Sequence, residues 1–471
     1  MERILFARIE TWLVLLLLIL AATAGGVWSY AVIEHHAFPR LQLSEIKNIV
    51  KGVPGDHRPL MVRLTSLVTF VPGEYPATRQ TQLLPESAYT AVVSAPSASQ
   101  PLPIFDSMRV ANPSGKSGTK RYFVIFGSFV FHEERENIGI IVVDSDGVIH
   151  RAWPLSIEGG ESRNLHIGMA VAGNGVIATN ANGILNAWDW CGKKLWQAPW
   201  APVGDGRRRG HNAPDAYDWH HDIVYYDNAF YTFVGSNIAT VNLKTGIVQK
   251  KISGIDIMRW AWRDGLSLLD THSRFFNPDH LTAETAVDFL AFDPFHFNKV
   301  DVLTDELAAD YPMFEGGDLL VSLRQLNLVL VLRPSEERIL WWRYGLTSRQ
   351  HDATFIDGAI EVFNNAPFTS PPRPSIRRLH VGRHDYETVF DLSQWKMVMR
   401  QKGNFERHGD QILTVDDEAG RMIAGRISGE VDFAFENGFE DEDDGTRNLQ
   451  LRNATELSAD VFARFETQCD R

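Results

Sequence analysis

A unit made of an apolar strand, a polar turn with Gly or Asp, and a second strand that often carries Trp recurs along this 471-residue chain. Its spacing is irregular but close to ~40 to 50 residues, the length of a four-stranded blade in a β-propeller. About six such blades fit between residue 120 and the end of the chain. A β-sandwich with long loops is the alternative, but the repeated Trp-bearing unit favours an all-β, six-bladed β-propeller. The unit occurs at residues 141–147, 187–196, 240–246, 329–342 and 423–433.

The amino-terminal region predicts a membrane anchor. Residues 11–33 contain no charged side chain, and as a helix they would be about 34 Å long, enough for a hydrocarbon core of roughly 30 Å. Arg3 and Arg8 precede this segment and Glu34 follows it, so the positive-inside rule leaves a short cytoplasmic tail. A cleaved signal peptide with a small-residue site at residues 22–24 is the alternative.

The sequence therefore predicts a single-pass protein of the inner membrane, with its propeller on the periplasmic, extracytoplasmic side. Few helices are expected after the anchor, and residues 282–290 are the clearest candidate. The expected segments are a cytoplasmic tail (1–10), a transmembrane anchor (11–33), a stalk or linker (34–119) and the propeller (120–471).

Charge and cysteine content exclude several functions. The formal net charge of −13 repels polyanions and offers no basic field to a nucleic-acid backbone, so no nucleic-acid partner is expected. Only Cys191 and Cys469 occur, and their separation matches neither a metal knuckle nor a CxxC redox pair. In an oxidising compartment the two could pair, although nothing in the sequence brings them together.

Two segments place histidines beside apolar strands. His220 and His221 form a pair at the start of a predicted strand, and successive strand residues face opposite sides. We therefore expect one of them to face the propeller axis and the other to pack between blades. His296 and Asn298 lie two residues apart, so an extended backbone would put them on one face. Taken singly, each histidine also fits a structural role.

Two further segments add an arginine and a fourth histidine. Arg324 interrupts a strand-like run at residues 319–327, and an arginine in a central strand needs an anionic partner or loses solvation. A substrate anion and a buried ion pair both satisfy that need. His351 opens the predicted strand 351–356, and propeller sites usually open at strand ends.

The order of these motifs resembles the arylsulfotransferase family over roughly residues 215–435. The motifs are His-His-Asp, then Asp-x-x-His-x-Asn, then Ser-x-Arg, then a Trp-containing strand followed by Gln-His-Asp-Ala. The resemblance implies a bacterial, mostly periplasmic enzyme with a six-bladed propeller that uses no nucleotide sulfate donor and needs no cofactor. It further implies that His351 is transiently sulfated, with His220 or His221, His296, Asn298 and Arg324 as supporting residues.

These residue types suit transfer of a sulfuryl group from an aryl sulfate to a phenol. A neutral imidazole, with a pKa near 6.5, has a lone pair for attack on sulfur at pH 7. The guanidinium of Arg324 would bind the sulfonyl oxygens and Asn298 would help to bind the substrate. His296 or His221 would move the phenolic proton. One departure is Asn364, which stands where the family usually has an Asp.

Two functions from other classes compete with the enzyme. One is a membrane-anchored scaffold or glycan-binding propeller that catalyses nothing and has structural histidines. The other is a metal site, since imidazole is a common metal ligand. That site would be built from His220, His221, His296 and His351.

Overall fold

The structure is a computed structural model, and it divides into two compact units, Met1–Thr81 and Gln82–Arg471. All of the residues that it describes lie in the second unit. The expected anchor and the alternative cleavage site lie outside the described residues, as does the helix expected at 282–290. The described residues are 83–95, 108–113, 120–131, 135–155, 168–181, 183–198, 219–268, 295–367, 372–399, 402–417, 419–441 and 445–469.

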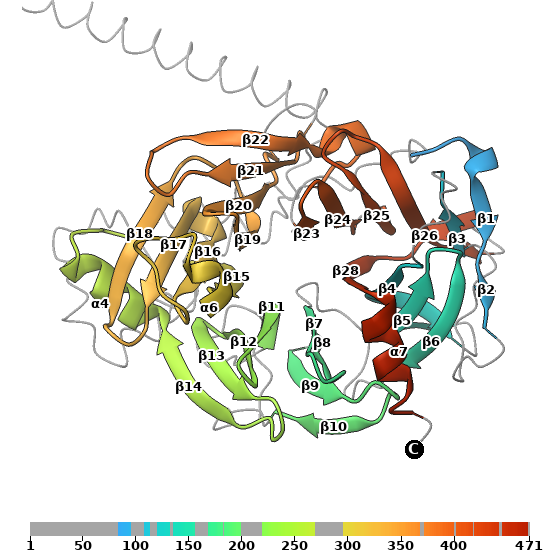
Figure 1. Ribbon diagram of the computed structural model, residues 1–471, viewed down its shortest axis with the longest axis horizontal. Helices are drawn as coiled ribbons and strands as arrows, with labels where there is room; N and C mark the ends of the chain where they lie inside the picture. Colours follow the sequence, from blue (N-terminus) through green and yellow to red (C-terminus); the bar gives the residue numbers. More distant parts are fainter. Residues whose placement is uncertain are drawn as a thin grey trace, which may run out of the picture. The chain divides into compact units, whose positions relative to one another are not determined.

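The second unit is an all-β, six-bladed propeller, as predicted from the repeat. Six sheets are arranged around a central axis (Figure 1), and each is built on four antiparallel strands that run from the axis outward. The innermost strands, blade by blade, are β28 (Leu451–Leu457), β7 (Met169–Val171), β11 (Trp219–Tyr226), β15 (Phe297–Val302), β19 (His351–Ile356) and β23 (Phe405–His408).

The remaining strands follow the chain order within each blade. Blades 1 and 2 add β4 (Tyr122–Phe131), β5 (Arg135–Asp144) and β6 (Val148–Pro154), then β8 (Ile177–Ala181), β9 (Ile184–Trp188) and β10 (Lys194–Gln197). Blades 3 and 4 add β12 (Ala229–Val234), β13 (Asn237–Asn242) and β14 (Val248–Ser253), then β16 (Leu319–Leu323), β17 (Leu328–Arg333) and β18 (Arg338–Tyr344). Blades 5 and 6 add β20 (Ala359–Asn364), β21 (Ser375–Leu379) and β22 (Tyr386–Asp391), then β24 (Gln411–Asp416), β25 (Arg421–Arg426) and β26 (Val431–Asp441).

Both ends of the described chain close the ring. The carboxyl-terminal strand β28 pairs with β4 and becomes the innermost strand of blade 1. On the other side, β3 (Met108–Ala111) pairs with β26 of blade 6, and β1 (Tyr89–Ala91) pairs with β3. The short β2 (Val93–Ser94) pairs with β6. Strands of the propeller therefore also come from the segment expected to be a stalk or linker. Near the carboxyl terminus, β27 (Gly445–Asn448) pairs antiparallel with the end of β26.

Burial explains why the inner strands are so apolar. Every residue of β16 is buried, as are the first five of β17, because neighbouring blades cover both faces of the sheet. A strand covered on both faces has a continuous apolar sequence rather than an alternating one. The outermost strand β18 alternates between buried and exposed positions, since one of its faces meets solvent.

The repeated turn and its Trp have a common physical basis. In blade 2 the Asp189 side chain accepts hydrogen bonds from two backbone N–H groups, and Gly192 closes the turn with a φ of 85° that favours glycine. A Cβ at Gly192 would overlap the Trp153 ring of blade 1. In blade 2, Trp196 donates its Nε1–H to the Leu243 carbonyl beside the equivalent turn of blade 3 at 2.8 Å. The turn and the Trp that repeat in the sequence thus make the contacts between neighbouring blades.

Short helices fill places where the strand repeat is interrupted. The helix α4 (Gly254–Arg263) follows blade 3 with a capping box at Ser253, and its C-cap Asp264 accepts a hydrogen bond from the Ile339 N–H of blade 4. The other helices of the described residues are η2 (Glu86–Ala88), α6 (Asp305–Ala308), η4 (Arg324–Leu326), η5 (Leu392–Trp395) and α7 (Ala459–Glu466). None of the helices in this part of the chain combines the length and apolar character that crossing a bilayer requires.

The carboxyl-terminal helix α7 brings the two cysteines together. Its Phe462 and Phe465 pack against Trp190, and Glu466 accepts a hydrogen bond from the Trp190 ring at 2.8 Å. Cys469 follows this helix and forms a disulfide with Cys191, across a Cα–Cα distance of 5.4 Å. Their 278-residue separation concealed this pairing, because only the closure of the ring makes them neighbours.

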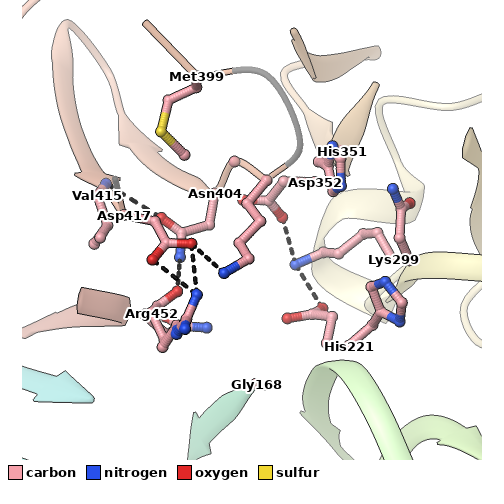
Figure 2. Close-up of a pocket in the computed structure, with 15 residues that line it drawn as sticks. Gly168, His221, Lys299, His351, Asp352, Met399, Asn404, Val415, Asp417 and Arg452 are labelled. Carbon is pink, nitrogen blue, oxygen red and sulfur yellow. Dashed lines mark hydrogen bonds and ion pairs between the residues drawn. The ribbon is translucent and has the colours of Figure 1, made fainter. Parts of the chain in front are cut away.

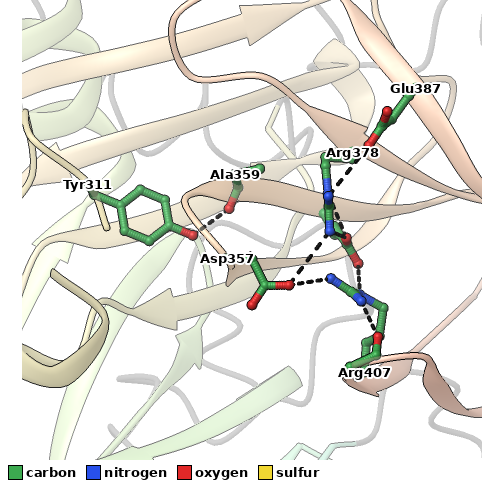
Figure 3. Close-up of polar contacts among 8 residues, drawn as sticks. Tyr311, Asp357, Ala359, Arg378, Glu387 and Arg407 are labelled. Carbon is green, nitrogen blue, oxygen red and sulfur yellow. Dashed lines mark hydrogen bonds and ion pairs between the residues drawn. The ribbon is translucent and has the colours of Figure 1, made fainter. Parts of the chain in front are cut away.

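A buried ion-pair cluster joins blades 5 and 6 (Figure 3). Glu361 of β20 is completely buried and accepts hydrogen bonds from Arg378 at 2.8 Å and from Arg407 of β23 at 2.7 Å. Asp357 lies 2.8 Å from Arg407 and is largely exposed, as is Glu387, which lies 3.5 Å from Arg378. Glu361 is therefore the carboxylate on which both arginines depend inside the protein.

Glu361→Gln should lower the free energy of unfolding by about 3 to 5 kcal/mol, because it leaves the buried Arg407 without its main counter-charge. The control is Glu387→Gln, which removes an exposed member of the same cluster and should cost about 1 kcal/mol or less. Urea denaturation followed by tryptophan fluorescence measures both. Equal midpoints for the two variants would contradict this account.

Candidate active site

A pocket opens where the innermost strands of all six blades meet (Figure 2). It encloses about 580 Å³ of space, part of it continuous with solvent. His221, Asn298 and His351 lie on its wall, so blades 3, 4 and 5 each bring one predicted residue to it. Its lining also includes Gly168, Asp222, Lys299, Asp352, Met399, Lys402, Gly403, Asn404, Val415, Asp417, Arg452 and Asn453.

β-Bulges explain why adjacent residues share this pocket. The pairing of β11 with β12 shifts register between His220 and Ile223, and the same happens in β19 between His351 and Thr354. A bulge leaves residues unpaired and redirects their side chains, so simple alternation between faces does not apply there. His221 and Asp222 therefore both line the pocket. One histidine of the pair therefore faces the pocket and the other packs on Phe233, as expected, but a bulge accompanies this arrangement and also brings Asp222 into the pocket.

His351 is held as a neutral imidazole of one tautomer. Its Nδ1 lies 2.7 Å from the Asn365 side-chain oxygen and 3.1 Å from the Arg349 carbonyl, and both of these groups only accept hydrogen bonds. Asn365 is oriented in turn, because its NH₂ group donates to the Lys402 carbonyl at 2.5 Å. The proton therefore sits on Nδ1 and the lone pair on Nε2. Burial and the nearby Arg324 charge lower the pKa of His351 to about 3.

The other three predicted histidines form one ring cluster. His220 donates from Nε2 to the Gly235 carbonyl at 2.8 Å, so its Nδ1 accepts the proton of His221 Nδ1, which lies 2.5 Å away. His221 then has its basic nitrogen at Nε2. His296 contacts the His221 ring edge-on, with the ring centroids 4.9 Å apart. His221 lines the pocket, whereas His220 packs on Phe233 and orients its neighbour.

Arg324 and Asn298 complete the predicted set. The strand β16 ends at Leu323 and Arg324 begins the short helix η4, so the expectation of an arginine inside a strand was wrong. The charge of its guanidinium acts on His351, and its backbone N–H donates to the His296 carbonyl at 3.2 Å. The Asn298 NH₂ group donates to the Gln350 carbonyl at 2.8 Å. Its Oδ1 is buried and has no hydrogen-bond partner among the described residues.

An ionic group beside the histidines was not predicted from the sequence. Lys299 of β15 is 2.8 Å from Asp222 and 2.7 Å from Asp352, and Figure 2 shows its side chain between blades 3 and 5. Burial raises the pKa of Asp222 to about 7 despite the opposing effect of Lys299, and the two carboxylates raise the Lys299 pKa. Each carboxylate directly follows a predicted site histidine, which is the signal that could have revealed the group.

The opposite wall carries a second ionic group. Asp417 lies 2.7 Å from the Arg452 guanidinium and 2.5 Å from Lys402. Arg452 belongs to the closing strand β28, and Asn404 donates to its carbonyl at 2.8 Å. This group joins blade 6 to blade 1 at the pocket.

The described residues contain no group of three or more His, Cys, Asp or Glu side chains arranged to hold a metal ion. His221 contacts both His220 and His296, His220 also contacts the Gly235 carbonyl, and His351 contacts the Asn365 amide.

The pKa of His351 predicts a pH-dependent stability. As pH falls below about 6.5, the unfolded chain protonates this residue while the folded protein does not until about pH 3, so stability falls over this window. Relative to His351→Gln, the free energy of unfolding of the wild type should fall by about 1.4 kcal/mol for each unit that the pH drops within this window. Above pH 7 the difference between the two proteins should not depend on pH. Urea denaturation at pH 7.5 and 5.5 tests this, with the exposed His408→Gln as control. A difference that does not change with pH would mean that the folded ring is protonated.

The fold and the site define a six-bladed β-propeller with a central pocket that contains histidines. The family model described as arylsulfotransferase (ASST) matches residues 169–438, which is more than half of the chain. The chain belongs to the arylsulfotransferase family. All six predicted site residues lie within the matched part.

Other comparisons are weaker. No curated protein matches the chain. A Bacteroides caccae protein of unknown function has 13% identity and a TM-score of 0.41, over 72% of this chain and 99% of its own. The virginiamycin B lyase of Staphylococcus aureus has 12% identity and a TM-score of 0.33, covering 57% and 69%. BamB of Moraxella catarrhalis has 9% identity and a TM-score of 0.31, over 65% of this chain and 69% of its own. Similarity at this level supports no inference about activity.

Proposed function

We propose that the protein transfers a sulfuryl group from an aryl sulfate to a phenolic acceptor through a sulfohistidine at His351. The observation that carries the proposal is the fixed tautomer of this ring. With its proton held on Nδ1 by Asn365 and its pKa near 3, the ring keeps a lone pair on Nε2 throughout the neutral range. Membership of the arylsulfotransferase family supports the substrate class.

In the first step, Nε2 of His351 forms a bond to sulfur while the bond from sulfur to the donor's phenolic oxygen breaks. The phenolate leaves with the bonding electron pair and takes a proton from the histidine cluster, where the donor is either His221 in its imidazolium form, with the added proton on Nε2, or His296. Arg324 binds the sulfonyl oxygens, whose negative charge suits a permanently charged guanidinium. The sulfated His351 side chain is then neutral overall, because the negative charge of its –SO₃⁻ group balances the positive charge of the ring. Its Nδ1–H still donates to Asn365.

The second step reverses the first with a new phenol. The same histidine removes the phenolic proton, the oxygen attacks sulfur, and the Nε2–S bond breaks to regenerate neutral His351. Asn298 lines this pocket and has a buried Oδ1 without a hydrogen-bond partner among the described residues, so we assign it to holding the phenol's hydroxyl group. The reaction balances without an oxidant, a reductant or a cofactor.

We also propose the location expected from the sequence, with residues 11–33 as an inner-membrane anchor and the propeller in the periplasm. The Cys191–Cys469 disulfide supports an oxidising compartment, because such bonds are rare in the cytosol. Fusing a reporter that folds only in the periplasm to the carboxyl terminus tests this. An active reporter is expected, and activity of a cytoplasm-specific reporter at the same position would contradict it.

The experiment for the activity uses the full-length protein and para-nitrophenyl sulfate. Release of nitrophenol should depend on added phenol, and without acceptor the peptide containing His351 should gain the mass of one SO₃ group. A non-catalytic scaffold or glycan-binding propeller would release nothing with any donor and would take no label. Label on another residue would reject His351 as the nucleophile.

A further inference from the structure

We propose that Lys299 is a positioning residue that fixes His221 and His351 relative to each other, because it forms an ion pair with the aspartate that follows each histidine. The inference rests on the proposed function for its kinetic consequences. We call Lys299, Asp222 and Asp352 the lysine clasp. Its members come from the innermost strands of three successive blades, β15, β11 and β19.

The clasp spans the two bulges that carry the histidines. The Lys299 ammonium lies 2.8 Å from an Asp222 oxygen and 2.7 Å from an Asp352 oxygen. Since Asp222 directly follows His221 and Asp352 directly follows His351, one side chain controls the backbone beside both rings. The second Asp352 oxygen accepts a hydrogen bond from the Phe405 N–H of blade 6 at 2.5 Å. Asp352 is therefore held by both blade 4 and blade 6.

These bulges need external support. His221 has a φ of 57° and Asp352 a φ of 45°, a left-handed region that costs a non-glycine residue of order 1 kcal/mol or more. Such conformations persist only where surrounding contacts hold them. For β11, further support comes from blade 2, where the Asn180 NH₂ group donates to the His221 carbonyl at 2.7 Å. The clasp is the contact that both bulges share.

The charges make the clasp indispensable to this geometry. Lys299 and both carboxylates are largely buried, and one ammonium serves two acids. Asp301 and Glu406 add further buried acidic groups nearby. Without Lys299 the two aspartates would lose the ammonium that joins them and would repel each other or share a proton, so β11 and β19 would no longer be held together. A displacement of about 1 Å at a reacting group costs roughly 10²-fold in rate.

The two halves of the clasp should affect different steps of catalysis. Asp352→Asn loosens the nucleophile His351, which attacks every donor, so para-nitrophenyl sulfate and phenyl sulfate should lose kcat equally. Asp222→Asn loosens His221, and a poor leaving group such as phenolate needs its proton more than nitrophenolate does. Phenyl sulfate should therefore lose about 10²-fold, but para-nitrophenyl sulfate only about threefold.

The main test is Lys299→Met in the full-length protein. We expect kcat to fall about 10²-fold or more with both donors, with KM unchanged within about threefold, because the sulfonyl-binding Arg324 stays in place. The matched control is Arg333→Met, which breaks the bidentate ion pair with buried Asp318 in the same blade, at 2.9 Å and outside the pocket. It should lower the thermal midpoint and leave kcat within about threefold.

Wild-type kcat in Lys299→Met, or a loss no larger than that of Arg333→Met, would overturn the proposal. Identical donor dependence in Asp222→Asn and Asp352→Asn would overturn it as well. Two double variants replace Lys299→Met if that protein does not fold. Lys299→Met/Asp222→Asn and Lys299→Met/Asp352→Asn each remove one buried positive charge together with one buried negative charge. Both should fold and remain slow. Full activity in them would mean that Lys299 only balances charge.

A crystal structure of Lys299→Met, or of either double variant, tests the positioning role of the lysine clasp without any measurement of the reaction. Displaced His221 and His351 rings are expected, and unchanged ring positions would overturn the proposal. A wild-type protein that takes no label from any aryl sulfate would instead contradict the proposed function alone.

Discussion

His351→Ala should abolish sulfuryl transfer and the labelled intermediate together, lowering kcat by at least ~10⁴-fold with para-nitrophenyl sulfate. No other imidazole in the described pocket is fixed in the same way: His351 alone combines an Nδ1–H held by Asn365 with the charge of Arg324 beside it. Donor release in the presence of phenol and mass spectrometry of the labelled protein measure the two effects. The fold should be retained, because the deleted ring borders open space in the pocket.

The control is His408→Ala, which removes an exposed histidine of β23 outside the pocket and should leave turnover and labelling unchanged. A purified His351→Ala protein that still transfers sulfuryl groups at more than a hundredth of the wild-type rate would remove His351 from the nucleophile's role. Partial recovery of His351→Ala by added imidazole would support it, since the small base can occupy the vacated space.

Arg324→Lys should lower kcat/KM by about 10² to 10³-fold, although it keeps the positive charge. An ammonium cannot bind two sulfonyl oxygens in one plane as a guanidinium does. Because the charge remains, the pKa of His351 should stay low and the ring should stay neutral, so the loss reports on the geometry of sulfonyl binding. Steady-state kinetics with a series of aryl sulfates measures the effect.

Arg324→Met separates the two roles of this arginine. It removes the charge that helps to lower the pKa of His351, so the acid limb of the pH–rate profile should move upward in Arg324→Met but not in Arg324→Lys. Arg333→Lys, in the same blade but away from the pocket, is the control and should keep wild-type kcat/KM. If Arg324→Lys also keeps it, the sulfonyl group is bound elsewhere.

Local sequence anticipated the strands and turns because their causes are local. The turn of Asp189 and Gly192 has a counterpart at Asp144 and Gly147 in blade 1, and continuous apolar runs such as β16 mark sheets covered on both faces. The site histidines were found for a related reason, since the ordered motifs that contain them sit at the starts of innermost strands. The alternation rule, however, does not account for Asp222, which lines the pocket together with its neighbour His221 because of a bulge.

Contacts between distant segments were beyond the reach of sequence analysis. Nothing local marks Lys299 as the partner of Asp222 and Asp352, or Asn365 as the acceptor that fixes the tautomer of His351. The same holds for the disulfide at the end of α7.

By itself, then, the sequence determined the repeated blade, the apolar faces that pack blade on blade, and the identity of the groups that can react, because these depend on spacing along the chain. Only the closure of six blades into a ring decided which of those groups meet, how each proton is held and which charges are buried together. Ring closure makes neighbours of residues hundreds of positions apart, and the pKa of His351 is a property of that arrangement rather than of its own motif.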